Sequence, residues 1–307
     1  MSEEDLKFNH PRPVFRLGRW VSVAVVALVV LGLINSLFTN PNYHWEMVWA
    51  YLTHPNLIKG IGFTLALTVG AMTIGVTLAI TMAVMRQSPN PVLKGVAWFY
   101  IWFFRGTPIY TQLIFWGLLP TLYPMITLGI PFGPELFAVE TKLVLNMFWS
   151  AMLGLGLNEG AYLAEIVRAG LNSVNPGQWE AATALGMKRG MILRRIVIPQ
   201  AMRVIVPPTG NETISMLKTT SLVSVVPFTL ELNFQAQNLG RLTFMPVPMM
   251  ICAAIWYLLI TSILMVGQYY LEKYFGKGFN AQQAATSPRS KTLSAAPETK
   301  TLLDVKS

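Results

Sequence analysis

Apolar residues gather along the chain in long continuous runs that are separated by shorter polar stretches. The runs cover residues 20–38, 58–85, 106–119, 143–167, 204–226 and 249–271. They are near or above the roughly 20 residues that an α-helix needs to cross the hydrocarbon core of a bilayer. The pattern therefore predicts an all-α integral membrane protein with six transmembrane helices.

Composition supports this prediction independently of the order of the residues. Hydrophobic residues make up 53% of the 307 positions and charged residues only 12%. The mean hydropathy is +0.48. These values are too apolar for a soluble domain of this length.

The segments outside the runs predict how the chain is organised. Residues 1–19 form a polar leader, so the run at 20–38 is either a secretory signal peptide or an anchor helix. It has no small-x-small cleavage site before Pro41, which favours an uncleaved anchor. Residues 279–307 are rich in Ala, Ser, Thr, Pro and Lys, and we expect a disordered cytoplasmic tail. The outer segment Pro120–Glu140 has four prolines and is expected to be a compact turn region.

Lys and Arg fall mainly in alternate connections. They are Lys7, Arg12, Arg16 and Arg19, then Arg86 and Lys94, then Lys188, Arg189, Arg194, Arg195 and Arg203, and finally Lys273, Lys277, Arg289 and Lys291. The other connections contain only Lys59, Lys142 and Arg241. By the positive-inside rule, both termini and the connection after the fourth run are cytoplasmic. The net charge of +9 is then a consequence of topology, and nucleic-acid binding is not expected.

The connection after the fourth run carries a spaced motif. It reads Glu180, Ala181 and Ala182, then Gly186 after three residues, and then Ile196, Ile198 and Pro199. This spacing resembles the E-A-A-x3-G-x9-I-x-L-P loop of ABC importer permeases, with Ile198 in place of the usual Leu. The alternative is an ordinary amphipathic helix pair on the bilayer surface, which the basic residues of the segment would also suit.

Flanking blocks resemble one branch of that family, the permeases for polar amino acids such as histidine, glutamine, glutamate, arginine and opines. The blocks are Arg105–Pro108, Asn158–Tyr162, Ala164–Arg168, Pro176–Trp179, Pro199–Ala201, Pro207–Pro208, Asn211 and Lys218–Val225. The resemblance runs from about Gly60 to Gly278. Asn158-Glu159-Gly160 departs from the commoner Glu-Ser opening of the branch, which leaves the choice of substrate open.

The resemblance implies a five-helix type I permease core at residues 58–278, preceded by one extra N-terminal helix. Two such permease subunits, identical or paralogous, would enclose a path in the bacterial cytoplasmic membrane. Two ATPase subunits would dock on the loops at residues 180–199 and bind ATP and magnesium, so this chain would need no cofactor. An extracytoplasmic binding protein would deliver a polar or charged amino acid, while an opine or a polyamine stays an alternative substrate.

Residues that other functions need are missing. The chain has no G-x-x-x-x-G-K-[ST] loop for nucleotide phosphates, so it is not itself the ATPase. It has no paired His or Cys at metal-binding spacing, and its only aspartates are Asp5 and Asp304. An enzyme is therefore not expected. A secondary transporter or channel without an ATPase is the remaining alternative, and the motif at 180–199 argues against it.

Polar residues within the runs are the candidates for the substrate path, because such residues are unfavourable in hydrocarbon. Asn158, Glu159 and Tyr162 stand in the fourth run, and Gln112 stands in the third. Packing between helices is the alternative role for these side chains. Glu165 and Arg168 are three residues apart and are expected to form a local ion pair.

The fifth run is the second polar region. Pro207 and Pro208 are expected to break or kink its helix. Four further path candidates follow, namely Asn211, Ser215, Thr220 and Ser221. Transporters often place their sites where a helix is interrupted near the middle of the membrane.

Overall fold

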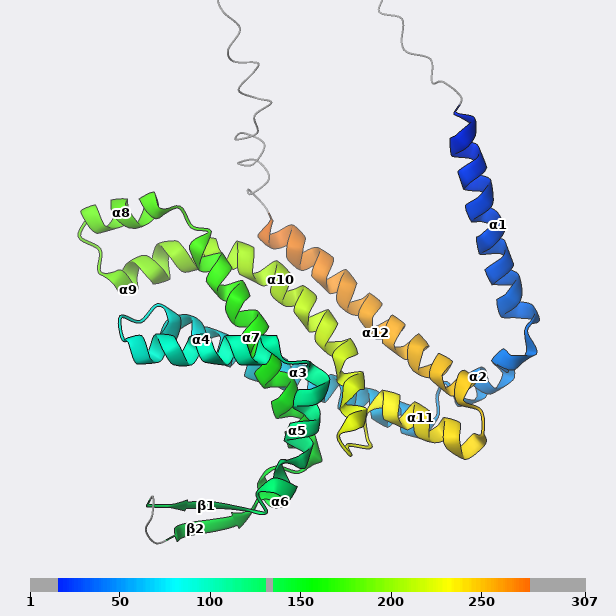
Figure 1. The fold of residues 1–307 in the computed structure, drawn as a ribbon. Coiled ribbons are helices and arrows are strands. Elements are labelled where there is room, and N and C mark those ends of the chain that lie inside the picture. The colour runs from blue at the N-terminus through cyan, green and yellow to red at the C-terminus, as the bar shows by residue number, and fades with distance from the viewer. Residues whose placement is uncertain (1–15, 131–134, 277–307) are drawn as a thin grey trace, which may run out of the picture.

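The computed structural model describes residues 16–130 and 135–276, and almost every element is a helix (Figure 1). The first half contains α1 (Leu17–Thr39), η2 (Pro41–Tyr43), α2 (Trp45–Tyr51), α3 (Pro55–Arg86), α4 (Pro91–Gly106), α5 (Ile109–Leu122), β1 (Met125–Gly129), β2 (Glu135–Glu140) and α6 (Thr141–Val144). The second half contains α7 (Met147–Asn172), α8 (Pro176–Ala184), α9 (Arg189–Ile192), η3 (Leu193–Val197), α10 (Ile198–Thr219), η4 (Thr220–Val225), α11 (Leu232–Thr243) and α12 (Pro246–Phe275). Residues 1–15 of the expected leader and the whole expected tail lie outside the described residues, whereas Leu17–Arg19 of the expected leader belong to α1.

Several helices begin with a polar residue followed by proline. The Asn90 side chain accepts a hydrogen bond from the backbone N–H of Val92 at 2.9 Å, just before α4. The Asn175 side chain does the same for Gly177 at 2.8 Å before α8. Proline suits the first helical position because its missing N–H would have no partner there. Local sequence therefore sets where these helices begin.

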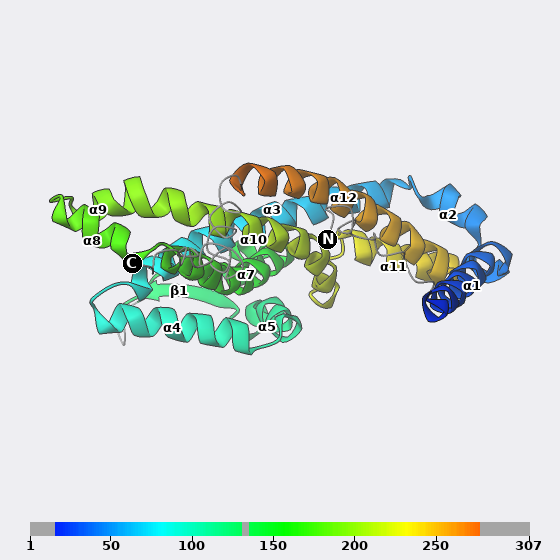
Figure 2. The same ribbon diagram turned by 90° about the horizontal axis from the view of Figure 1, so that it is seen from above.

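The central core forms where α3 and α7 pack along each other. Glycines allow the close approach, because a Cβ on Gly160 would lie 2.9 Å from the Leu78 Cβ on α3 and 2.6 Å from the Tyr100 hydroxyl oxygen on α4. That hydroxyl donates a hydrogen bond to the carbonyl of Leu157 at 2.6 Å, which ties α4 to α7. Seen from above, α3 and α12 run along one edge of the molecule, α4 and α5 along the other, with α7 and α10 between them (Figure 2).

A second core joins α2, α3, α11 and α12. Glu231, a fully buried carboxylate at the start of α11, bonds to several of these helices. It accepts hydrogen bonds from the hydroxyls of Thr64 on α3, at 2.8 Å, and Tyr257 on α12. It also accepts one from the backbone N–H of Asn233 at 2.7 Å, as a helix cap. One side chain thus links three helices.

Among the described residues, three helices are long and apolar enough to cross a membrane, namely α1, α3 and α12. Helix α1 buries no residue, and Figure 1 shows it standing apart from the other helices. The Trp45 indole N–H donates a hydrogen bond to the Leu37 carbonyl at 2.7 Å, which joins the end of α1 to α2. The apolar run at 20–38 lies entirely within α1, which is one continuous helix.

The third predicted span, at 106–119, has different boundaries in the structure. Helix α4 ends at Gly106 and α5 begins at Ile109, so the predicted span corresponds to α5, and a hinge at residues 107–108 separates it from α4. Thr107 lies in the hinge with φ −111° and ψ 142°, an extended conformation. Pro108 explains this, because a following proline disfavours the helical conformation.

Two further expectations differ from the structure. The segment Pro120–Glu140 contains an antiparallel hairpin of β1 and β2, with Ile126 opposite Val139, where a compact turn region was expected. Helix α10 continues through Pro207 and Pro208, so the break that was one of the two expected outcomes does not occur. The Gln268 side chain on α12 donates a hydrogen bond to the Pro207 carbonyl at 2.8 Å. Such contacts from a neighbouring helix help a membrane helix to tolerate proline.

Candidate substrate path and coupling segment

A pocket of about 490 Å³ opens where the hinge between α4 and α5 meets α7 and α10. Its polar lining includes Arg105, Asn158, Glu159, Tyr162, Glu212 and Ser215. Four of these residues are path candidates predicted from the sequence, namely Asn158, Glu159 and Tyr162 on α7 and Ser215 on α10. The structure brings them together around one cavity.

Glu159 is the most distinctive side chain of this pocket. It is only 5% exposed, and its Oε1 atom has no hydrogen-bond partner. Gly75 of α3 lies behind it, because a Cβ at that position would come within 3.0 Å of the Glu159 Cγ. A buried carboxylate oxygen without a partner is unfavourable unless a donor or a cation reaches it.

Asn158 and Gln112 hold the hinge. The Asn158 amide donates to the Phe104 carbonyl at 2.9 Å and to the Gln112 Oε1 at 3.2 Å. The Gln112 amide donates to the Thr107 carbonyl at 3.0 Å and to the Thr107 hydroxyl at 2.7 Å. Gln112 itself does not line the pocket among the described residues, so its contacts stabilise the end of α4. The Thr107 hydroxyl accepts a hydrogen bond from Gln112, and it makes no capping hydrogen bond at the start of α5.

The pocket also carries a positive group. The Arg105 guanidinium carbon lies 5.4 Å from the ring centroid of Tyr162, which is the geometry of a cation–π contact. Glu165, one turn further along α7, accepts hydrogen bonds from the guanidinium of Arg168 at 2.7 and 2.9 Å. It also pairs with Arg86 of α3 at 3.3 Å. The predicted Glu165–Arg168 ion pair is confirmed within α7, and the contact of Glu165 with Arg86 ties α3 to α7.

The motif at 180–199 forms a short unit that projects from the bundle. Helix α8 ends in a Schellman motif, with the Gly186 N–H bonded to the Thr183 carbonyl at 2.9 Å and the Met187 N–H to the Ala182 carbonyl at 3.1 Å. Gly186 has φ +73°, a left-handed conformation that glycine adopts without strain. The chain then reverses into α9 and the π-helical turn η3.

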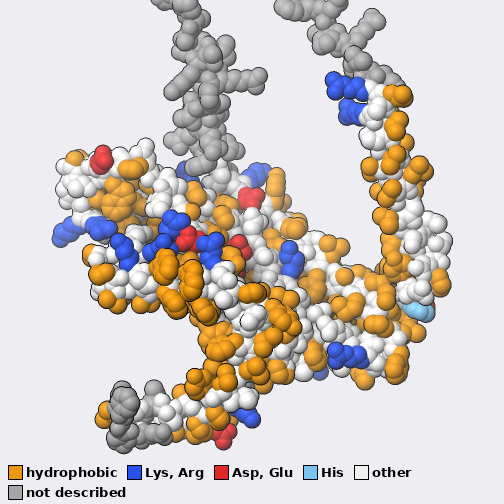
Figure 3. Space-filling model, viewed as in Figure 1, with side chains coloured by type: hydrophobic (Ala, Val, Ile, Leu, Met, Phe, Trp, Pro, Cys, Tyr) orange, Lys and Arg blue, Asp and Glu red, His pale blue; other side chains and the backbone are white. Residues whose placement is uncertain are grey.

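The residues of this unit divide into a buried base and an exposed surface. Ala182 is buried with Ile192, Val197 and Ala201 in a small apolar cluster. Glu180, Ala181, Gly186, Ile198 and Pro199 are exposed. Figures 1 and 3 place α8 and α9 at the upper left, with basic side chains gathered around them. The hairpin of β1 and β2 lies at the other end of the molecule (Figure 1).

This arrangement matches a known family of proteins. Residues 75–277 match the model of the binding-protein-dependent transport system inner membrane component. The match covers well over half of the chain. The chain belongs to this family.

Individual relatives agree with this assignment. The arginine transport system permease protein ArgU of Corynebacterium glutamicum is 52% identical over 87% of this chain and 83% of its own length. The octopine transport system permease protein OccM of Rhizobium meliloti is 38% identical over 73% of this chain and 85% of its own length. A solved structure of an amino acid ABC transporter with histidines is 36% identical, with a TM-score of 0.61, and the match covers 75% of this chain and 97% of that one.

The family assignment confirms the predicted resemblance and the all-α membrane fold. The protein is a multi-pass permease component of an ABC-type importer, and it is not an enzyme. The alternative class, a secondary transporter or channel without an ATPase, is therefore not the class to which this chain belongs.

Not every path candidate from the sequence reaches the pocket. Asn211 is exposed but does not belong to its lining, and Ser221 is half-buried with its hydroxyl bonded to the Lys218 carbonyl. Thr220 is fully buried, and its hydroxyl bonds to the Leu217 carbonyl. These residues remain candidates only for a path that extends beyond the pocket.

Glu212 was not selected as a path residue, although its spacing could have revealed it. Glu212, Ser215 and Thr219 stand at positions i, i+3 and i+7 of α10, so they share one helix face. All three line the pocket. A polar stripe at helical spacing within an apolar run is the signal that would have found this second carboxylate.

Proposed function

We propose that this permease forms the path of an ABC importer for cationic amino acids, with arginine as the leading substrate. The observation that carries the proposal is the unpartnered Oε1 of buried Glu159, in a pocket that Glu212 also lines. A cationic side chain would supply the missing partner, and a carboxylate pairs well with a guanidinium. The name of the arginine permease ArgU supports the same substrate class.

The pocket offers a partner for each charged group of an amino acid. Glu159 and Glu212 would bind the cationic side chain or the α-ammonium group. Arg105, held over the Tyr162 ring, would bind the α-carboxylate. The hydroxyls of Ser215 and Thr219 would add neutral hydrogen bonds. An opine is the second candidate, because the octopine permease OccM is also a relative.

The proposal also includes the other subunits of the transporter. Two permease subunits would face each other, and two ATPase subunits with ATP and magnesium would dock on Glu180–Pro199 of each copy. An extracytoplasmic binding protein would deliver the substrate. ATP would favour one state through different contacts with the coupling segment in the two states.

The same proposal fixes the orientation in the bacterial cytoplasmic membrane. The start of α1 and the end of α12 lie at the same end of the molecule as α8 and α9 (Figure 1). If α8 and α9 meet the ATPase, this end is cytoplasmic and both termini are cytoplasmic with it. The charge distribution of the sequence supports that orientation. Residues 58–278 would form the permease domain.

Uptake by reconstituted transporters tests the substrate assignment. Glu159→Gln and Glu212→Gln keep the size of the side chains and remove their charges. We expect arginine uptake to fall at least about tenfold, because each charge-assisted hydrogen bond contributes about 1.5–3 kcal/mol. Glutamine uptake should fall less than arginine uptake. Glu46→Gln, at an exposed position on α2, is the matched control.

The outcome separates a substrate contact from helix packing. If Glu159→Gln complexes assemble normally and take up arginine, histidine and glutamine as the parent does, Glu159 serves packing only. Competition by octopine distinguishes the second candidate, because an opine permease would take up arginine less well than the opine.

A further inference from the structure

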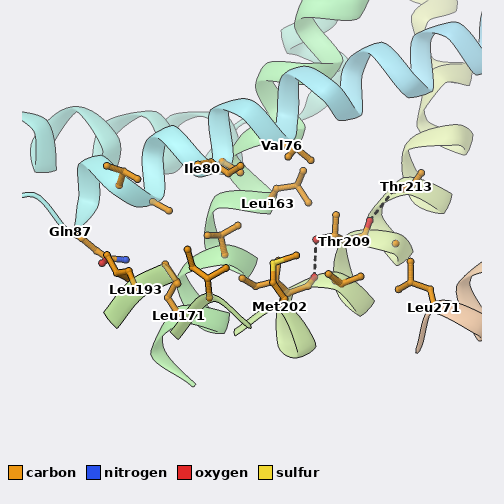
Figure 4. A pocket seen from close by; sticks show the side chains of 18 of the residues that line it. Val76, Ile80, Gln87, Leu163, Leu171, Leu193, Met202, Thr209, Thr213 and Leu271 are labelled. Carbon is orange, nitrogen blue, oxygen red and sulfur yellow. Dashed lines mark hydrogen bonds between the residues drawn. The ribbon is translucent and has the colours of Figure 1, made fainter. Parts of the chain in front are cut away.

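A second and larger cavity, of about 760 Å³, lies between α3, α7 and α10 (Figure 4). Figure 4 shows Val76 and Ile80 on one wall, Leu163 and Leu171 on another, and Met202 and Thr209 on a third. Leu193 and Gln87 lie together near one end, and Leu271 of α12 lies toward the other. We call this cavity the α3–α10 groove.

The walls of the groove are apolar. The hydroxyls of Thr209 and Thr213, which also line it, are bonded to the carbonyls of Ile205 and Thr209 in their own helix, at 2.8 and 3.0 Å. These polar groups are therefore already satisfied. A ligand of the groove needs apolar surface along most of its length and gains little from polar groups there.

Figure 4 shows Gln87 beside Leu193 at one end of the groove, and Arg189 stands four residues before Leu193 in the chain. Gln87 and Ser88 follow the end of α3, and Arg189 begins α9. Arg189 is the only charged residue of the lining among the described residues. It is exposed, and no ion pair in the described part of the chain includes it. The groove thus has an apolar body and a positively charged mouth.

The groove is separate from the proposed substrate path. No residue of the described chain lines both cavities. On α10 the groove uses Val206, Thr209, Gly210 and Thr213, whereas the path pocket uses Glu212, Ser215, Met216 and Thr219. Each set has the spacing of a single helix face, and the faces differ. The groove is therefore a cavity distinct from the proposed substrate path.

The dimensions fit a single leaflet of a bilayer. Along α3 the apolar wall runs from Val76 to Val84, which is about 12 Å at 1.5 Å per residue. This is less than half of the roughly 30 Å hydrocarbon core. With α9 on the cytoplasmic side, which rests on the proposed function, the mouth lies at the inner headgroup level.

We propose that the α3–α10 groove binds one acyl chain of an anionic phospholipid from the inner leaflet. The chain lies along Ile80, Val84 and Met202, and Arg189 pairs with the phosphate. Basic pockets between membrane helices on the cytoplasmic side are suited to such headgroups. The C-terminal residues 277–307 fit less well, because their composition is polar.

The site also touches the coupling segment. Arg189, Leu193 and Ile198 belong both to the lining of the groove and to the segment at 180–199. A bound lipid would therefore pack against α9 and η3 from the membrane side and hold them against α3 and α7.

Native mass spectrometry of the assembled transporter tests the proposal without any transport measurement. The complex is released from nanodiscs of equimolar phosphatidylglycerol and phosphatidylcholine, and the retained lipids are counted per copy of this chain. The parent should retain one phospholipid, with a preference for phosphatidylglycerol of roughly fivefold, because one interfacial Arg contributes about 1 kcal/mol. The number of retained lipids is measured without uptake. If the proposed substrate is wrong, the lipid count is therefore unaffected, and the two proposals can fail separately.

Two variants with matched controls locate the lipid. Arg189→Gln should retain the lipid but lose the preference for phosphatidylglycerol. Lys94→Gln, which removes a charge from α4 outside the groove, should keep both the lipid and the preference. Ile80→Trp should abolish retention by filling the groove, and the ring should not disturb the core because Ile80 is 55% exposed. Val69→Trp, at a 66% exposed position of the same helix outside the groove, should behave as the parent.

Three results would overturn the proposal. One is parent-like lipid retention by Ile80→Trp, and another is a parent without any preference for the anionic lipid. The third is a parent without retained lipid in which residues 277–307 cross-link to a cysteine introduced at Met202.

Discussion

Gly186 is the residue on which the shape of the coupling segment depends. Its φ of +73° lets α8 end in a Schellman motif, and the next residue then leads into α9. A residue with a Cβ is strained in this conformation by about 1–2 kcal/mol. The open space around Gly186 means that backbone conformation, and not crowding, is what requires glycine here.

Gly186→Asp should therefore leave the protein inserted in the membrane but reduce the coupling of ATP hydrolysis to transport. The strained turn would change the angle between α8 and α9, and the new charge would lie on the docking surface. The measurement is uptake per ATP hydrolysed in reconstituted complexes. Gly190→Asp adds the same charge at an open, helical position of the same segment and controls for charge alone.

Undiminished transport by Gly186→Asp, with the ATPase still co-purifying, would show that the turn does not set the coupling. An equal loss in Gly190→Asp would assign the effect to charge.

At the scale of elements, one buried side chain joins helices that are distant in sequence. Glu231 caps α11 and accepts hydrogen bonds from the hydroxyls of Thr64 on α3 and Tyr257 on α12. The linkage lies at the end of the molecule opposite α8 and α9 (Figure 1). It holds α11 in place while the other end of the bundle carries the coupling segment.

Glu231→Ala should lower the free energy of unfolding by about 3 kcal/mol, because it removes a helix cap and leaves buried hydroxyl donors without an acceptor. Thermal unfolding of the purified complex in detergent provides the measurement. Glu231→Gln keeps an acceptor oxygen and should lose less stability. Glu46→Ala, at an exposed carboxylate, should change stability by less than about 0.5 kcal/mol. A Glu231→Ala protein as stable as this control would contradict the structural role.

At the scale of the whole molecule, the two ends differ in chemistry. One end carries α8, α9 and a concentration of basic side chains, whereas the other carries the hairpin, α2 and α11 (Figures 1 and 3). Cytoplasmic segments of membrane proteins are enriched in Lys and Arg. The difference predicts one orientation in the membrane.

A reporter enzyme that is active only outside the cytoplasm tests this orientation. Fused after Ser307 it should be inactive, and fused after Asn42, which follows α1, it should be active. The fusions share one reporter, so each controls for expression of the other. The reverse pattern would place α8 and α9 outside the cell and would remove the proposed ATPase contact.

The sequence by itself determined those features of this protein that depend on local order. Hydropathy decides whether a segment is stable in a bilayer, so the apolar runs could be found without any structure, although the third contains a hinge that Pro108 imposes. The motif at 180–199 could also be recognised, because it is one continuous stretch whose turn requires glycine at position 186.

Only the tertiary structure decided which polar residues meet. Glu159 and Glu212 lie on different helices, and their shared pocket depends on how α7 and α10 pack. Gln112 proved to hold the hinge, and the α3–α10 groove has no sequence motif at all. The physical reason is that side chains distant in sequence meet only through helix packing, which a pattern of hydrophobic positions does not specify.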